Sequence, residues 1–174
     1  AMEASIILLP DTQHYTDDRA NRFEAQTQWI VANRDCLNIV MVLHESDVVG
    51  HVTQVDAWRN GAKCMALLDA AGIPYAVVPG NHDYEPESRD SSVFNFWFPL
   101  SRFENMATFV GAYERGASDN TVHFFSAAGV DFMVLALEFG PRDAVVAWAG
   151  GMAAAQPQRR VIVLTHGYLN AYGE

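Results

Sequence analysis

The sequence predicts an α/β protein in which buried strands alternate with helices. Four short, continuous apolar runs have the length and composition of strands buried on both faces: 5–9, 38–44, 74–78 and 160–164. Three longer segments carry apolar residues near helical spacing: 19–34, 55–71 and 142–155. Because strand–helix–strand units place their strands in parallel, we expect the carboxyl ends of the strands to meet at one edge of a sheet.

Length and composition are those of one domain, expected over 1–174. Half of the 174 residues are hydrophobic, which is enough for a core of ordinary size. The formal net charge of −10 argues against binding to a nucleic-acid backbone, which needs a basic surface, and suits a site that collects cations.

Two cysteines, Cys36 and Cys64, share no CxxC spacing, so we expect two buried free thiols and leave one disulfide open as the alternative. No apolar run has the length of a membrane span, and no leader sequence is evident. A cytoplasmic and an exported location both agree with these features.

Clear stop signals follow two of the first three strands and the second helix. Pro10 closes the run 5–9, Gly72 ends the second helix, and Pro79-Gly80 ends the run 74–78. In the second half, strands are expected at 121–127 and 131–139, joined by the short link 128–130. The aromatic cluster at 94–103 is interpreted as a hydrophobic plug, with an exposed binding platform as the alternative.

Polar side chains able to bind a metal follow four of the strands: Asp11 with Gln13, Asp47, Asn81 with His82, and His166. Two carboxylates, two amides and an imidazole, without a thiolate, suit Mn, Fe or Zn better than copper. A single carboxylate on a middle strand, Asp47, is suited to bridge two ions, and water between such ions becomes a nucleophile near neutral pH. This chemistry is suited to attack on phosphorus.

These residues occur in four motifs: Asp11-x-Gln13, His44-x-x-Asp47, Gly80-Asn81-His82-Asp83 and Thr165-His166. Their types and order resemble the calcineurin-like metallophosphoesterase superfamily, and the resemblance covers essentially the whole chain. It implies a four-layer α/β/β/α sandwich. It also implies a hydrolase of phosphate mono- or diesters with two divalent metal ions (Mn, Fe or Zn) and a metal-bridging hydroxide.

The resemblance also implies roles for single residues. The implied metal ligands are Asp11, Gln13, Asp47, Asn81 and His166, with Asp47 as the bridge. His82 would donate a proton to the leaving-group oxygen as general acid, and Asp83 would orient its ring.

Three departures from the family pattern matter. Gln13 stands where His is commoner, so the first ion should bind less tightly or be a different metal. Ser46 replaces the usual Gly before the bridging Asp, which costs about 1 kcal/mol if that backbone has a positive φ. The chain ends at Glu174 before the family's Gly-His-x-His segment, which we interpret as a C-terminal truncation or a real loss of two ligands.

Three hypotheses follow from that gap. The chain is most of a phosphoesterase domain, or a non-catalytic remnant that binds a metal, an anion or a protein, or a homodimer that supplies the missing ligands in trans.

Two further residues are candidates for substrate binding. Arg142 would compensate the charge of a phosphate, and His51 would reach the substrate from the loop after Asp47. The sequence does not indicate which phosphoester is the substrate.

Overall fold

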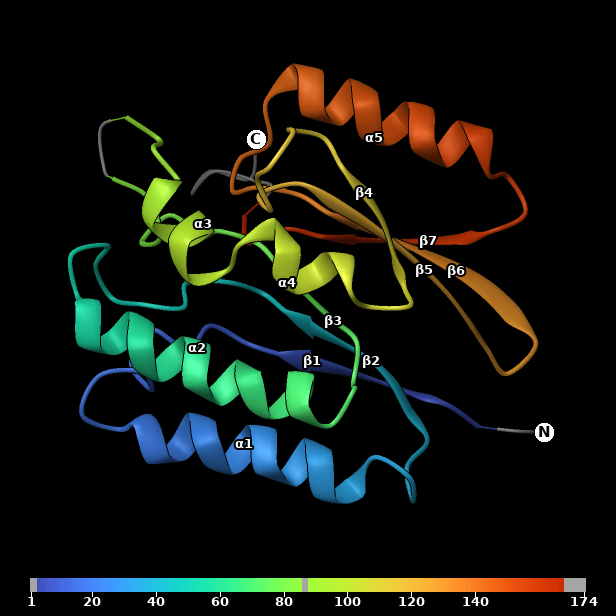
Figure 1. Cartoon of the computed structure of the whole chain (residues 1–174). Helices are drawn as coiled ribbons and strands as arrows, with labels where there is room; N and C mark the ends of the chain where they lie inside the picture. The colour runs from blue at the N-terminus through green and yellow to red at the C-terminus, as the bar shows by residue number, and fades with distance from the viewer. Residues whose placement is uncertain (1–2, 86–87, 168–174) are drawn as a thin grey trace.

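The computed structural model describes residues 3–85 and 88–167 (Figure 1). In chain order the elements are β1 (Ser5–Leu9), α1 (Ala20–Asn33), β2 (Ile39–His44), α2 (Val55–Ala70), β3 (Tyr75–Val77), α3 (Ser92–Trp97), α4 (Leu100–Glu104), β4 (Phe109–Ala112), β5 (Thr121–Ala127), β6 (Val130–Ala136), α5 (Asp143–Ala155) and β7 (Arg160–Leu164). None of the helices in these two ranges is both long and apolar enough to cross a membrane.

The strands form two sheets that pack face to face. β1, β2 and β3 make a parallel sheet with β2 in the middle. The second sheet has the order β4-β5-β6-β7, in which β6 and β7 run parallel and the other pairs antiparallel. α1 and α2 cover the outer face of the first sheet, and α5 covers the second (Figure 1). The expected four-layer α/β/β/α sandwich is therefore confirmed.

Three apolar cores lie between these four layers. In β2, Val42 packs toward the helices around Trp58, whereas Met41 and Leu43 point into the core between the two sheets. Val145 of α5 belongs to the third core, over the second sheet. Because β2 is buried on both faces, its sequence is an almost unbroken apolar run.

Two of the predicted strands are not buried on both faces. β1 and β7 lie at the margins of the described sheets, and Leu8 and Val163 are more than half exposed. The expectation of burial on both faces is wrong for these two strands. An apolar run predicts a strand, but whether a layer covers both of its faces depends on the order of strands in the sheet.

The aromatic segment after β3 folds as α3 and α4, followed by β4, which was not predicted. Phe94, Phe98 and Phe103 are buried, which confirms the hydrophobic plug, whereas Phe96 is 75% exposed. β4 is a short strand that contains Gly111 at an irregularity of its pairing with β5. Its pattern is therefore too weak to predict from sequence.

The hairpin between β5 and β6 is tighter than expected. Val130 pairs with Ala127, so only Ala128 and Gly129 form the turn, and their φ angles of 52° and 78° are those of a type I′ turn.

The cysteines are both free; Cys64 is buried, but Cys36 is exposed, contrary to expectation.

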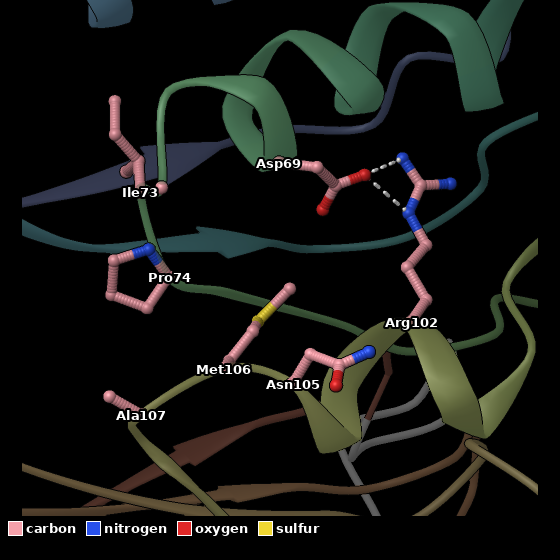
Figure 2. A pocket seen from close by; sticks show the side chains of 8 residues that line it. Asp69, Ile73, Pro74, Arg102, Asn105, Met106 and Ala107 are labelled. Carbon is pink, nitrogen blue, oxygen red and sulfur yellow. Dashed lines mark hydrogen bonds and ion pairs between the residues drawn. The ribbon is translucent and has the colours of Figure 1, made fainter.

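The ion pair between Arg102 and Asp69 holds α4 against the end of α2 (Figure 2). Arg102 Nε and Nη2 lie 2.9 Å and 2.7 Å from Asp69 Oδ2, and Nη2 also donates to the carbonyl of Ala62 at 3.1 Å. The guanidinium stacks over Phe98 and Tyr75. A hollow of about 450 Å³ lies beside this pair. Its wall includes the residues that precede β3, so it lies away from the carboxyl ends of the strands.

Replacement of Arg102 by Met should lower the free energy of unfolding by about 2 kcal/mol, because it leaves the Asp69 carboxylate and the Ala62 carbonyl without their donor. The matched control is Arg59→Met. Arg59 pairs with Asp56 on the surface and its side chain is 62% exposed, against 13% for Arg102. That control should cost less than about 0.5 kcal/mol. Urea unfolding followed by circular dichroism measures both; equal losses would contradict the anchoring role of Arg102.

His123 is a buried, neutral histidine in β5. Its ring nitrogens lie 3.2 Å and 3.3 Å from the hydroxyls of Thr108 and Thr121, and the rings of Phe103 and Phe109 pack around it. Burial lowers the pKa of His123 to about 4. Folding therefore keeps a proton off this ring at pH values where the unfolded chain would bind one.

Between about pH 6.5 and pH 4, the unfolded chain binds the proton and the folded chain does not, so the stability should fall as the pH falls. His123→Gln should remove a slope of up to about 1.4 kcal/mol per pH unit in this window. The buried His44 remains in this variant and should retain part of the pH dependence of stability. The exposed His14→Gln is the control. Thermal unfolding from pH 7 to pH 4 tests this expectation, and identical slopes in the two variants would refute it.

Candidate metal centre

Asp47 lies just beyond β2, and polar groups from three other strand ends meet at its carboxylate. Gln13, after β1, donates from Nε2 to Asp47 Oδ2 at 3.4 Å. His82, after β3, donates its backbone N–H to Asp47 Oδ1 at 3.0 Å. His166, after β7, brings Nε2 to 3.2 Å from Asp47 Oδ2. Asp47 is only 2% exposed, so the expected convergence of the strand ends occurs around one buried carboxylate.

Asp11 reaches this cluster through Gln13. Its carboxylate accepts the backbone N–H of Gln13 at 2.9 Å and the side-chain amide of Gln13 at 2.7 Å. The backbone N–H of Thr12 donates to the carbonyl of Asp47 at 3.2 Å, which ties the end of β1 to the end of β2. The Gln13 amide thus lies between the two carboxylates expected to bind metal.

His166 is oriented by a backbone carbonyl from the loop after β2. Its Nδ1 donates to the carbonyl of Glu45 at 2.8 Å, so Nε2 points at Asp47. The hydrogen bond with Asp47 raises the pKa of His166 to about 9, because both ring nitrogens face oxygen acceptors. A carbonyl that fixes one nitrogen and frees the other is the usual support of a metal-binding histidine.

His82 lies at the mouth of the cluster, half-exposed, with Nε2 4.0 Å from Asp47 Oδ2. Its Nδ1 donates to the carbonyl of Gly50 at 2.8 Å. The expectation that Asp83 orients this ring is wrong, because the carbonyl of Gly50 does so. A backbone carbonyl leaves no signal in the sequence, which is why sequence reasoning missed it.

Asp83 instead fixes the backbone around the centre. It is fully buried and accepts hydrogen bonds from the backbone N–H groups of Gly80, Val48 and Val49 and from the hydroxyl of Ser46, at 2.9–3.2 Å. Burial raises the pKa of Asp83 to about 7, and the backbone N–H groups act in the opposite direction. Asp83 therefore joins the loop after β2 to the turn after β3.

The backbone that carries Asp47 is strained. Ser46 has a φ of 88° and Asp47 a φ of 45°, so the positive φ considered for Ser46 is present. A side chain in this region costs about 1 kcal/mol or more. The hydrogen bond from the Ser46 hydroxyl to the buried Asp83 offsets that cost, since bonds to charged groups contribute about 1.5–3 kcal/mol.

His44 and Thr12 are two further residues of this edge to which the sequence analysis assigned no role. His44 Nδ1 accepts the backbone N–H of Ser46 at 2.9 Å, so its proton is on Nε2, which donates to Thr12 Oγ1 at 3.1 Å. Burial and the nearby His166 lower the pKa of His44 to about 3, so the ring is neutral. Their signal in the sequence is their place within two of the polar motifs, Asp11-x-Gln13 for Thr12 and His44-x-x-Asp47 for His44.

Asn81 and His51 lie on the rim. Asn81 is exposed between Gly80 and His82, and its side chain makes no hydrogen bond to any residue in 3–85 or 88–167. His51 is exposed on the loop after Asp47, directly after the Gly50 carbonyl that holds His82. Both residues lie near the centre, and their functions stay predictions.

Arg142 has a different environment from the one expected. Its guanidinium donates to Glu138 at 2.6 Å and 2.9 Å and also pairs with Glu114. Two carboxylates already neutralise this cation. The arrangement therefore argues against Arg142 as the residue that compensates the charge of a phosphate.

The donor set fits divalent cations in type. Carboxylate oxygens, amide groups and an imidazole held by a carbonyl suit Mn, Fe or Zn. Among the described residues, no three His, Cys, Asp or Glu side chains gather into a ready-made metal group. Of the five expected ligands, Asp47 and His166 are in direct contact, Asp11 and Asp47 are joined through Gln13, and Asn81 points to solvent.

Comparison with known sequences gives a match over nearly the whole chain. The model of the family described as calcineurin-like phosphoesterase matches residues 4–174. An uncharacterized protein of Bacillus subtilis (strain 168), YvnB, is 32% identical over 171 residues. That match covers 97% of this chain but only 13% of YvnB, so the chain corresponds to a small part of this relative.

Solved structures share the fold at low sequence identity. A dimetal phosphatase from Danio rerio gives a TM-score of 0.63 at 15% identity, over 95% of this chain and 70% of that one. The NAD nucleotidase of Haemophilus influenzae gives 0.57 at 14% identity, over 95% of this chain and 34% of that one. A purple acid phosphatase from yellow lupin gives 0.57 at 14%, over 96% and 32%. Together with the motifs at the strand ends and the family match, this sandwich shows that the chain belongs to the calcineurin-like phosphoesterase family.

Proposed function

We propose that this chain hydrolyses phosphate mono- or diesters with divalent metal ions held around Asp47. The observation that supports the proposal is the meeting of Gln13, His82 and His166 at one buried carboxylate. These side chains come from the ends of three strands in two different sheets. A role in stability alone would not require acidic and basic groups to be gathered at the carboxyl ends of the strands.

In this proposal the ions are held by Asp11, Gln13, Asp47, Asn81 and His166. When bound, Mn, Fe or Zn ions neutralise phosphoryl charge and lower the pKa of a water molecule that attacks phosphorus. To bind an ion, His166 has to lose the proton that it shares with Asp47, the Gln13 amide has to turn its oxygen inward, and the exposed Asn81 side chain has to turn toward Asp47. All three are changes of side chains only, because the backbone at Asp47 is already fixed by Asp83.

His82 is proposed as the general acid. The Gly50 carbonyl holds the proton of Nδ1, so Nε2 is the nitrogen that faces the mouth of the site. A proton on that nitrogen can pass to the leaving-group oxygen. General acid catalysis of this kind contributes about 10²–10⁴-fold to the rate, most for alcohols that leave poorly.

The alternative is a non-catalytic module that binds a metal, an anion or a protein. One observation favours it: His166, Gln13 and Asp47 already satisfy one another by hydrogen bonds. A homodimer that supplies further ligands in trans is a third arrangement. Metal content and hydrolysis rate, measured on the same sample, distinguish these proposals.

Gly80 gives the Asp47 carboxylate its space. A Cβ atom on Gly80 would lie 2.0 Å from Asp47 Oδ1, 2.7 Å from its backbone N and 2.8 Å from Ser46 Oγ. The first two distances are far below any real contact. The turn after β3 therefore approaches Asp47 so closely that only glycine fits.

We expect His82→Ala to reduce kcat for an alkyl phosphate by about 10²-fold or more, while the metal content per chain is unchanged. For 4-nitrophenyl phosphate the loss should be smaller, because nitrophenolate leaves without a proton. Asp47→Asn should lose the metal, since it removes the charge shared by the ions. Elemental analysis and steady-state kinetics in excess Mn measure both effects. An unchanged rate for the alkyl ester in His82→Ala would rule out the acid role.

Gly80→Ala should lower both the metal content and kcat/KM at least tenfold, because the added methyl group displaces the Asp47 carboxylate. The control is Gly150→Ala in α5, where a Cβ atom meets nothing within 4 Å and alanine favours the helix. That variant should keep its metal and its activity. Normal metal binding in folded Gly80→Ala, verified by circular dichroism, would show that the close approach is not needed.

A further inference from the structure

A polar hollow of about 400 Å³ lies on the second sheet's side of the proposed centre. Its wall includes Arg89, Ser91, Glu114, Asp119, Glu138 and Arg142. These residues come from the segment after the Gly-Asn-His-Asp turn, the β4–β5 connection, and the loop between β6 and α5.

The loop that carries Glu138 touches the strand ends of the centre directly. The N–H of Phe139 donates to the carbonyl of Pro79 at 3.1 Å, and the N–H of Gly140 donates to the carbonyl of Gly167 at 3.2 Å. The hydroxyl of Thr165 donates to the carbonyl of Glu138 at 3.1 Å. Glu138, which lines the hollow, and its neighbour Phe139 are thus hydrogen-bonded to the segments that follow β3 and β7. Those segments carry Asn81 and His166.

The charges in the hollow are nearly balanced. Arg142 pairs with Glu138 and Glu114, and Arg89 lies 3.7 Å from Glu138 and donates to the carbonyl of Phe139 at 2.5 Å. Two guanidinium groups therefore face three carboxylates, with Asp119 as the third. A second phosphate would meet more negative than positive charge, and a cationic group would meet two guanidinium groups. A neutral group avoids both penalties.

The hollow still has unused hydrogen-bonding capacity. Tyr84 is 5% exposed, and its hydroxyl has no hydrogen-bond partner among the residues that the structure describes. Tyr84 does not itself line the hollow, but Arg89, which does, stacks over the Tyr84 ring, so Tyr84 lies behind that part of the wall. Glu114 and Asp119 have more acceptor sites than their one or two hydrogen bonds use, whereas Glu138 already accepts four from Asn120 and Arg142. The guanidinium groups have spare N–H donors.

The hollow therefore offers both donors and acceptors at a formal charge close to zero. Among the described residues that line it, there is no aromatic side chain on which a nucleobase would stack. A hydroxyl group both donates and accepts, so several hydroxyls match this arrangement better than an aryl, alkyl or anionic group. Resting on the proposed function, we propose that this hollow binds the alcohol half of the substrate, and that this alcohol carries several hydroxyl groups, as in glycerol or a sugar.

The test compares two esters that differ only in hydroxyls, glycerol 3-phosphate and n-propyl phosphate, or their methyl diesters. With the Mn-loaded chain, kcat/KM should be at least tenfold higher for the glycerol ester, since a site built for hydroxyls penalises their loss. Glucose 6-phosphate is a third ester in the comparison, and its kcat/KM shows whether the hollow prefers a cyclic or a linear polyol. Equal kcat/KM for all three esters would overturn the inference while leaving the proposed hydrolase intact.

Two variants locate the effect. Glu114→Ala and Asp119→Asn should reduce kcat/KM for the glycerol ester about tenfold more than kcat/KM for n-propyl phosphate. Glu104→Ala, an exposed carboxylate on α4, is the matched control and should change neither. Equal loss on both kinds of ester would mean that the wall is structural, and the hollow would not be the alcohol site.

A binding experiment separates this inference from the proposed function. If no ester is hydrolysed, NMR titration of the metal-free chain with glycerol and glucose, against 1-propanol and cyclohexanol, decides. A polyol site in a non-catalytic chain is supported if glycerol and glucose, but not the simple alcohols, change the chemical shifts of residues in the hollow only. These changes should be lost in Glu114→Ala. The same shifts with the simple alcohols, or none at all, overturn it.

Discussion

The buried carboxylate of Asp83 is the constraint on which the rest of this edge depends. Three backbone N–H groups and one hydroxyl, from the loop after β2 and the turn after β3, converge on it. A buried carboxylate without such donors would be strongly unfavourable, so the two segments have to stay together. This link holds Ser46 and Asp47 in a left-handed backbone and brings Gly80 against Asp47.

Other parts of the centre also use backbone groups as supports. Carbonyls of Glu45 and Gly50 orient His166 and His82, and a neutral His44 links the ends of β1 and β2. Such supports do not titrate near neutral pH and do not compete as metal ligands. The folded chain therefore sets the positions of the segments that carry the proposed ligands, and a bound ion would have to replace only side-chain hydrogen bonds around Asp47.

The electrostatics divide this edge into two parts. The chain has a net charge of −10 and its acidic groups at this edge include Asp11, Asp47 and Asp83, so attraction of a phosphate depends on bound cations. Beside these groups, the hollow around Arg142 has its charges paired, and Arg142 contributes no net positive charge. One part is thus suited to bind an ionic group through metal ions, and the other to bind a neutral polar group through hydrogen bonds.

The sequence by itself determined most of the strands and helices and the polar residues at the strand ends, because apolar runs, helical spacing and polar motifs are local patterns. The four-layer sandwich was implied by the resemblance of those motifs to the metallophosphoesterase family. The sequence did not reveal β4, the exposure of β1 and β7, the Gly50 carbonyl behind His82, or the pairing of Arg142 with Glu138 and Glu114. Those depend on which layer covers a strand and which distant backbone atom approaches a side chain. Only tertiary packing decides these contacts, because the backbone carbonyl and N–H groups are chemically alike in nearly every residue and so leave no signal in the sequence.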